Sequence, residues 1–288
     1  MKRVILFLLV YCFFSIGCSK LDSKIKVPSY IEIDNYTTLT DSNSQGTNNQ
    51  YFTDVLVETS TANYGYYPIP GKIPLPFDGS TFLMIRPVIR VNGVSALRVD
   101  YPMMKGSDTT LPLTTGQIIK FNPIFKYYSS VNFRFKEDFE TASIQIKNSN
   151  AADTFGVDTK HPQNFYGGHY CLYMQSDANH TICQAQSWNA FYLPNGPNIY
   201  LEINYKSNCS FEVGVIGTNN INGGLLDQRS AGGTIASTTW KKFYVDLTAL
   251  VRTPPNYSWY YLYFYSEYDN STALNQIYID NIKVISQN

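Results

Sequence analysis

Strand-like alternation of apolar and polar residues runs through most of this chain, with no convincing 3.6-residue helical period after its first segment. Between Val27 and Tyr128 the apolar period is close to two, and Pro and Gly interrupt it at regular intervals. From about Ser129 a second series of such runs begins. The pattern predicts an all-β protein with two sandwich domains, residues 27–128 and 129–288.

The charge balance excludes one broad class of function. Lys and Arg number 22 and so do Asp and Glu, and charged residues make up 15% of the chain, against a usual share of about 25%. A polybasic nucleic-acid binder is therefore not expected. The 24 tyrosines supply much of the remaining polarity, which suits an extracellular β-rich protein.

The first residues predict a secretory address. Met1-Lys2-Arg3 is a basic start, and the apolar stretch that follows to Gly17 is shorter than a membrane-spanning helix. The sequence Ser15-Ile16-Gly17-Cys18 resembles a bacterial lipoprotein lipobox, with Ser15 in place of the usual Leu. We expect a signal peptide over residues 1–17, lipidation of Cys18, and a short polar tether over residues 18–26. An ordinary secretory peptide with an incidental Cys18 is the alternative.

Two local features of the strands can be predicted from turn chemistry. Asn92-Gly93 accepts positive φ at both central positions, so a two-residue type I′ hairpin turn is expected at Val91–Val94. In the terminal run the apolar parity changes, which a β-bulge at Asp280-Asn281 would reconcile.

One late strand separates its side chains into two faces. In the run from Tyr257 to Tyr265, Leu262 and Phe264 mark the core side, so every second ring is expected to point outward. The same alternation in other runs predicts further outward tyrosines. The candidate binding residues are Trp259, Tyr261, Tyr263, Tyr265, Tyr244, Tyr173 and Tyr200.

Several motifs are similar to known families. Trp240 to Thr248, the terminal run Ile277 to Val284 and the acidic stretch Glu137-Asp138-Phe139-Glu140 resemble the galactose-binding-like jelly rolls of carbohydrate-binding modules. Val27 to Asp34 resembles the Ig-like domain of Bacteroidota surface lipoproteins. The expected order is an N-terminal Ig-like β-sandwich followed by a C-terminal jelly roll.

The resemblance implies a metal site, and the cysteines allow one bridge. Jelly rolls of this kind often hold a structural calcium, for which Glu140 and Asp280 are the candidate ligands; turn capping by the same carboxylates is the alternative. No other cofactor is expected. Cys171 and Cys183 flank a polar turn and are the best candidates for a disulfide, with buried free thiols as the alternative.

The sequence contains no signature of catalysis, so we expect a non-enzyme. No nucleophile elbow, phosphate-binding loop or zinc-protease motif is present. The leading hypothesis is a lipid-anchored outer-membrane lipoprotein, facing the cell surface, that docks to a larger transport or β-barrel assembly complex. Glycan binding by the jelly roll is the alternative. In a third interpretation the aromatic face is simply covered by the protein itself.

Overall fold

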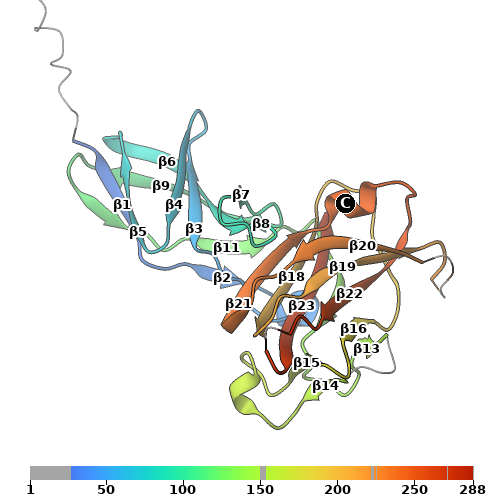
Figure 1. Ribbon diagram of the computed structural model, residues 1–288. Coiled ribbons are helices and arrows are strands. Elements are labelled where there is room, and N and C mark those ends of the chain that lie inside the picture. Colours follow the sequence, from blue (N-terminus) through green and yellow to red (C-terminus); the bar gives the residue numbers. More distant parts are fainter. Residues whose placement is uncertain (1–26, 150–153, 222–223, 225, 271, 288) are drawn as a thin grey trace, which may run out of the picture.

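The computed structural model describes residues 27–149, 154–221, 224, 226–270 and 272–287. The predicted signal peptide, Cys18 and the tether lie outside the described residues. Within them the protein is almost entirely β-structure, as the alternation predicts (Figure 1). The short helices are α2 (Ser42–Gln45), α3 (Thr248–Arg252) and the 3-10 turn η1 (Pro162–Asn164). No helix in the described part of the chain has the length and apolar character needed to cross a membrane.

The N-terminal half consists of three small sheets around one core. The first contains β1 (Ser29–Ile33), β5 (Gly71–Leu75) and β10 (Ile118–Lys120). The second contains β2 (Thr37–Leu39), β8 (Met104–Lys105) and β11 (Ile124–Tyr127). The third contains β3 (Asp54–Glu58), β4 (Asn63–Pro68), β6 (Gly79–Arg90), β7 (Arg98–Asp100) and β9 (Ser107–Leu113). This is a β-sandwich in outline; its kinship to Ig-like domains stays a prediction.

The C-terminal half consists of two facing six-stranded sheets. The first, here called the inner sheet, contains β12 (Val131–Glu137), β14 (Thr154–Asp158), β15 (Cys171–Ser176), β18 (Ile199–Ser207), β21 (Ser237–Asp246) and β23 (Asn275–Gln287). The second, the outer sheet, contains β13 (Ile146–Asn148), β16 (Ile182–Ser187), β17 (Phe191–Tyr192), β19 (Glu212–Thr218), β20 (Leu226–Gly233) and β22 (Trp259–Glu267).

The order of the strands makes this half a jelly roll, as expected. The inner sheet runs β15-β23-β18-β21 and the outer sheet runs β16-β22-β19-β20, so the chain crosses repeatedly between the two layers. The apolar residues of both sheets meet in one core, which includes Leu172, Ile203 and Leu262. The β-bulge predicted in the last strand is present. Ile279 before it and Ile282 after it are both buried, and the register with β18 shifts at that point.

The turn predicted at Val91–Val94 has the expected backbone conformation, but it does not connect two strands directly. Asn92 and Gly93 both have positive φ, and the Val94 amide donates to the Val91 carbonyl. The flanking strands β6 and β7, however, pair only up to Arg90 and Arg98, so the turn lies within a longer loop. That loop contacts the jelly roll, because the Asn92 amide donates to the carbonyl of Tyr244 at 2.9 Å.

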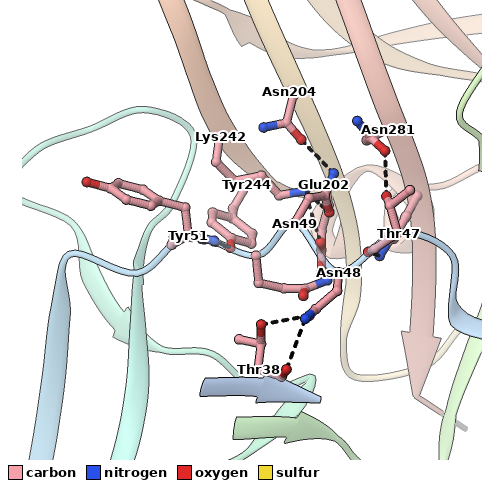
Figure 2. Close-up of polar contacts among 12 residues, drawn as sticks. Thr38, Thr47, Asn48, Asn49, Tyr51, Glu202, Asn204, Lys242, Tyr244 and Asn281 are labelled. Atoms are coloured by element: carbon pink, nitrogen blue, oxygen red, sulfur yellow. Dashed lines mark hydrogen bonds and ion pairs between the residues drawn. The ribbon is translucent and has the colours of Figure 1, made fainter. Parts of the chain in front are cut away.

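The two halves share a buried interface on the inner sheet. Tyr200, Tyr244 and Ile285 point outward from that sheet and join the N-terminal core. The two tyrosine rings pack against aromatic residues of the N-terminal half. Tyr244 stacks on Phe52 with ring centroids 6.0 Å apart. Beside this apolar contact, the segment from Thr47 to Tyr51 crosses β18, β21 and β23 (Figure 2).

A charged cluster lies at the centre of this interface. Glu202, fully buried on β18, lies 3.2 Å from the ammonium of Lys242, which is equally inaccessible. Tyr101 and Tyr127, both from the N-terminal half, donate their hydroxyls to Glu202 at 2.6 and 2.7 Å. Burial on its own would raise the pKa of Glu202, but the two nearby lysines and the two hydroxyls hold it below its ordinary value. The interface therefore contains a stable carboxylate whose partners come from both halves.

We expect Glu202→Gln to reduce the free energy of unfolding by about 3 to 5 kcal/mol, because it leaves the buried Lys242 without its counter-charge. Urea denaturation followed by tryptophan fluorescence measures the change. Glu58→Gln, the same substitution at a partly exposed site on β3, is the matched control and should leave the midpoint almost unchanged. Equal effects of the two substitutions would show that the cluster does not stabilise the protein.

Candidate functional site

The candidate binding residues fall on two different faces of the jelly roll. Trp259, Tyr261, Tyr263 and Tyr265 lie on β22, in the outer sheet, with side chains directed away from the core. Tyr173, Tyr200 and Tyr244 lie on β15, β18 and β21, in the inner sheet. The sequence predicted both sets as outward-facing; they cannot form one continuous binding face, because the core separates them.

Three of the seven residues are inaccessible: Tyr263, which is described below, and the pair Tyr200 and Tyr244. Tyr200 and Tyr244 are 5% and 3% exposed, since the N-terminal half packs over them. The Tyr244 hydroxyl donates to the carbonyl of Tyr51 and accepts from the Tyr51 amide, at 3.2 and 3.1 Å. For this pair the expectation of a partner-binding surface is wrong, and the interpretation in which the protein covers its own rings is correct.

The outer sheet presents a face that is only partly buried, which we call the open face. It is formed by outward side chains of five adjacent strands and lies away from the interface with the N-terminal half (Figure 1). Its aromatic residues are Tyr192, Trp259, Tyr261, Tyr263 and Tyr265. Its other side chains are Gln184, Gln186, Glu212, Ile216, Gln228, Ser230 and Glu267.

The rings of the open face form a row along one strand and its neighbour. Trp259, Tyr261 and Tyr265 are each half-buried, and Tyr192 on β17 is 44% exposed. Tyr192 pairs with Trp259 in register, and their ring centroids lie 6.2 Å apart in an edge-to-face arrangement. Each ring of the row therefore leaves part of its surface accessible, while packing against neighbouring side chains holds the ring in place.

Tyr263 belongs to the same row but is inaccessible. Its ring lies against Gly214, where a Cβ would approach within 2.8 Å of the phenol, and its hydroxyl donates to the Glu212 carboxylate. Burial and then the Glu212 contact raise the pKa of Tyr263. Tyr263 thus holds the Glu212 side chain at the start of β19 and contributes no ring surface of its own.

Polar side chains flank the rings on both sides. Gln184 and Gln186 on β16 lie directly opposite Tyr265 and Tyr263, and Gln228 lies across Ile216 from Tyr261. Amide groups supply both donors and acceptors, so the Tyr265 and Tyr261 end of the row has hydrogen-bonding side chains on nearby strands. The sequence analysis missed Tyr192 and these glutamines. The alternation Cys183-Gln184-Ala185-Gln186 carried the signal for the glutamines, whereas the two-residue strand of Tyr192 had none.

Tyr173 lies on the part of the inner sheet that the N-terminal half leaves uncovered. Its ring centroid is 5.2 Å from that of Tyr278, and its hydroxyl accepts from the Gln276 amide. These side chains line a cavity of about 520 Å³ together with Asp158 and His161. The pair is separate from the open face.

The predicted disulfide is not formed. Cys171, Cys183 and Cys209 are all buried free thiols. The reason lies in strand parity, because Cys183 points into the core between the sheets while Cys171 points to the other side of β15 and its thiol contacts the carbonyl of Asn164. Two side chains on opposite sides of a sheet layer cannot bridge.

The two predicted calcium ligands lie close enough for their charges to interact. Glu140 accepts the amides of His169 and Tyr170 at 2.8 and 3.1 Å, which is the turn-capping role. Asp280 is buried, and its pKa rises to about 8, first through burial and also through the charges of Glu140 and Asp138. Among the described residues, no group of three or more His, Cys, Asp or Glu side chains is arranged to hold a metal. Calcium binding here stays a prediction.

Comparison with solved structures gave carbohydrate-binding modules among the similar chains. Neither a scan of protein-family models nor a search of curated proteins gave a match. Similar solved structures include TmCBM61 in complex with beta-1,4-galactotriose, which is 13% identical over 52% of this chain and 91% of its own, with a TM-score of 0.33.

Two further structures show the same level of likeness. A carbohydrate-binding module of the beta-sandwich superfamily is 10% identical over 90% of this chain and 99% of its own, with a TM-score of 0.38. The family 30 module of a cellulosomal cellulase of Clostridium thermocellum is 19% identical over 53% of this chain and 90% of its own, with a TM-score of 0.36. At this level of similarity we base no ligand assignment on them.

If Glu140 and Asp280 bind calcium, millimolar Ca²⁺ should raise the melting temperature of the chelator-treated protein by several degrees, because a ligand that binds only the folded state stabilises it. The Glu140→Gln variant should lose this increase. Glu58→Gln, distant on the N-terminal half, should retain it. An unchanged melting temperature in the presence of Ca²⁺ would leave turn capping as the role of both carboxylates.

Proposed function

We propose that this protein is a non-catalytic glycan-binding protein, and that the open face is its binding surface. The observation that carries the proposal is the row of partly exposed rings, Tyr192, Trp259, Tyr261 and Tyr265, on the side of the outer sheet that points away from the core. Sugar rings present flat C–H surfaces that stack on aromatic side chains, and their hydroxyls need paired donors and acceptors.

The polar residues of the face fit the second requirement. Gln184 lies beside Tyr265, and Gln228 lies one strand beyond the neighbour of Tyr261, so a sugar unit stacked on either ring would have an amide on a nearby strand. The face carries two carboxylates, Glu212, which accepts from Tyr263, and Glu267, which accepts from Tyr265 at 3.4 Å. The face therefore favours an uncharged saccharide, since a ligand anion would be repelled by Glu212.

Docking to a membrane complex, the leading hypothesis from the sequence, is less well supported by this arrangement. That hypothesis relied on a broad tyrosine-rich surface, and the structure removes Tyr200, Tyr244 and Tyr263 from it by burial. What remains is a narrow row of rings with glutamine side chains on the neighbouring strands. Such a row matches a linear polymer better than a standard protein interface, whose centre is a packed apolar patch.

The expected outcome of Trp259→Ala is a loss of binding to neutral polysaccharides of about tenfold or more, equivalent to about 1.4 kcal/mol, because the variant deletes the largest ring of the row. Tyr261→Ala should have a similar effect. Affinity electrophoresis through gels containing soluble galactan, xyloglucan or mannan measures retention, and titration calorimetry gives the affinity.

The matched control is Tyr66→Ala, which removes an exposed tyrosine from β4 on the N-terminal half and should leave retention unchanged. The proposal fails if the intact protein is retained by no neutral polysaccharide in a broad panel. It also fails if Trp259→Ala is retained as strongly as the parent. Loss of a stoichiometric membrane-protein partner on Trp259→Ala, without any glycan effect, would instead favour docking.

We further propose that Cys18 carries a lipid and anchors the chain to the outer membrane at the cell surface. The proposal is supported by the sequence Ser15 to Cys18 and the basic and apolar residues before it. Glycan capture at a surface benefits from such an anchor, because binding is then confined to the layer next to the membrane.

Cys18→Ala should release the protein from the membrane fraction and abolish incorporation of labelled fatty acid, because the acyl chains need the thiol. Cell fractionation and metabolic labelling measure the two effects. Ser15→Ala, which leaves the cysteine in place, is the control. Fractionation of Cys18→Ala with membranes, together with an unlabelled parent protein, would contradict lipid anchoring.

A further inference from the structure

A second cavity lies where the two halves meet, remote from the open face. Its volume is about 750 Å³, within the usual range for small-molecule sites. The N-terminal half contributes Tyr51 and Arg90 to its wall, and the jelly roll contributes Tyr166, Trp240 and Lys241. We call this cavity the junction groove.

The junction groove has aromatic surface on both walls. Tyr51 is 60% exposed, and Figure 2 shows its ring directed away from Glu202 and Asn204, although its backbone is tied to Tyr244. Opposite to it, the rings of Tyr166 and Trp240 pack with centroids 5.4 Å apart. Rings from two separate domains therefore line the same groove.

Trp240 also carries an unsatisfied donor. Its indole Nε1 is shielded from solvent and has no hydrogen-bond acceptor in the described part of the chain. A shielded donor without an acceptor is costly, so the group calls for a partner such as a water, an ion or a ligand atom. A ligand with oxygen acceptors would satisfy it.

The charge of the junction groove is positive. Arg90, Lys241 and Lys242 line it, and its wall contains no Asp or Glu. The charge of Lys242 is balanced by Glu202. Arg90 shares one carboxylate, Asp54, with Arg98, each at 3.5 Å, so that group of three has a surplus positive charge. Lys241 is exposed and forms no ion pair within the described residues.

An added peptide strand could not pair with the whole of β21. β21 is the edge strand of the inner sheet, and an added strand would need its free backbone groups. Asn92 already occupies that edge, since its amide donates to the Tyr244 carbonyl and its side chain accepts from the Asp246 amide at 3.0 Å. Pairing of a peptide strand with β21 at Tyr244 and Asp246 is therefore blocked.

We propose that the junction groove binds an acidic saccharide, in which the sugar rings stack on Tyr51 and Trp240 and a carboxylate or sulfate meets Arg90 and Lys241. The rings select for a saccharide and the uncompensated cations select for its negative charge. This site does not depend on the open face, whose carboxylates Glu212 and Glu267 favour an uncharged ligand. One chain would then recognise two kinds of glycan at two places.

The test uses the full chain with polygalacturonate and chondroitin sulfate as probes, and galactan as the neutral comparison. The intact protein should bind both acidic polymers, more weakly as salt is raised. Arg90→Gln and Lys241→Gln should each weaken this binding at least fivefold. In the Arg90→Gln variant the buried Asp54 still has Arg98 as an ion-pair partner. Trp240→Phe keeps a six-membered aromatic ring at the site and removes the five-membered ring that carries the N–H, so it tests the indole with less disturbance of the packing than an alanine would cause. Lys126→Gln, an exposed lysine on β11, is the matched control.

The open-face variant Trp259→Ala separates the two proposals. It should retain full affinity for the acidic polymers, whatever its effect on galactan. The inference is overturned if the intact chain binds neither acidic polymer, if the groove variants bind as the parent does, or if Trp259→Ala removes the acidic binding. Competition by poly-glutamate as strong as that by polygalacturonate would overturn the saccharide assignment in favour of an acidic peptide.

Discussion

The buried carboxylate of Glu202 is the group on which the arrangement of this protein depends. Such a charge is tolerated only where counter-charges and hydrogen-bond donors surround it, and here the lysine comes from the jelly roll whereas the two tyrosine hydroxyls come from the N-terminal half. Neither half alone satisfies the group. The two sandwiches are therefore held in one relative position by a shared polar cluster as well as by apolar packing.

That position decides which aromatic residues are available to a ligand. Outward rings occur on both sheets of the jelly roll, and strand parity treats Tyr244 and Tyr261 alike. The N-terminal half covers the first and leaves the second half-buried. The accessibility of the rings on the open face is thus a consequence of where the other domain sits, since the same kind of side chain becomes core on one sheet and stays partly exposed on the other.

The features that local chemistry controls could be predicted from the sequence. Asn92-Gly93 adopts the positive φ values that its turn requires, and the bulge before Ile282 follows from the change of apolar parity. Sheet membership could not be predicted, because it depends on pairing between distant segments. Cys171 and Cys183 flank one turn yet point into different environments, and Tyr173 and Tyr261 belong to opposite layers. Parity gives the direction of a side chain relative to its own strand and says nothing of what covers it.

A groove between two domains binds well only if its walls are already in place, since ordering them on binding would cost affinity. The walls of the junction groove meet this condition. The backbone amide and carbonyl of Tyr51 both form hydrogen bonds with the Tyr244 hydroxyl. The loop that follows Arg90 is held to β21 through Asn92. The contacts that hold the halves together are immediate neighbours of the groove. The interface that covers one face of the jelly roll therefore also holds the walls of the junction groove in place.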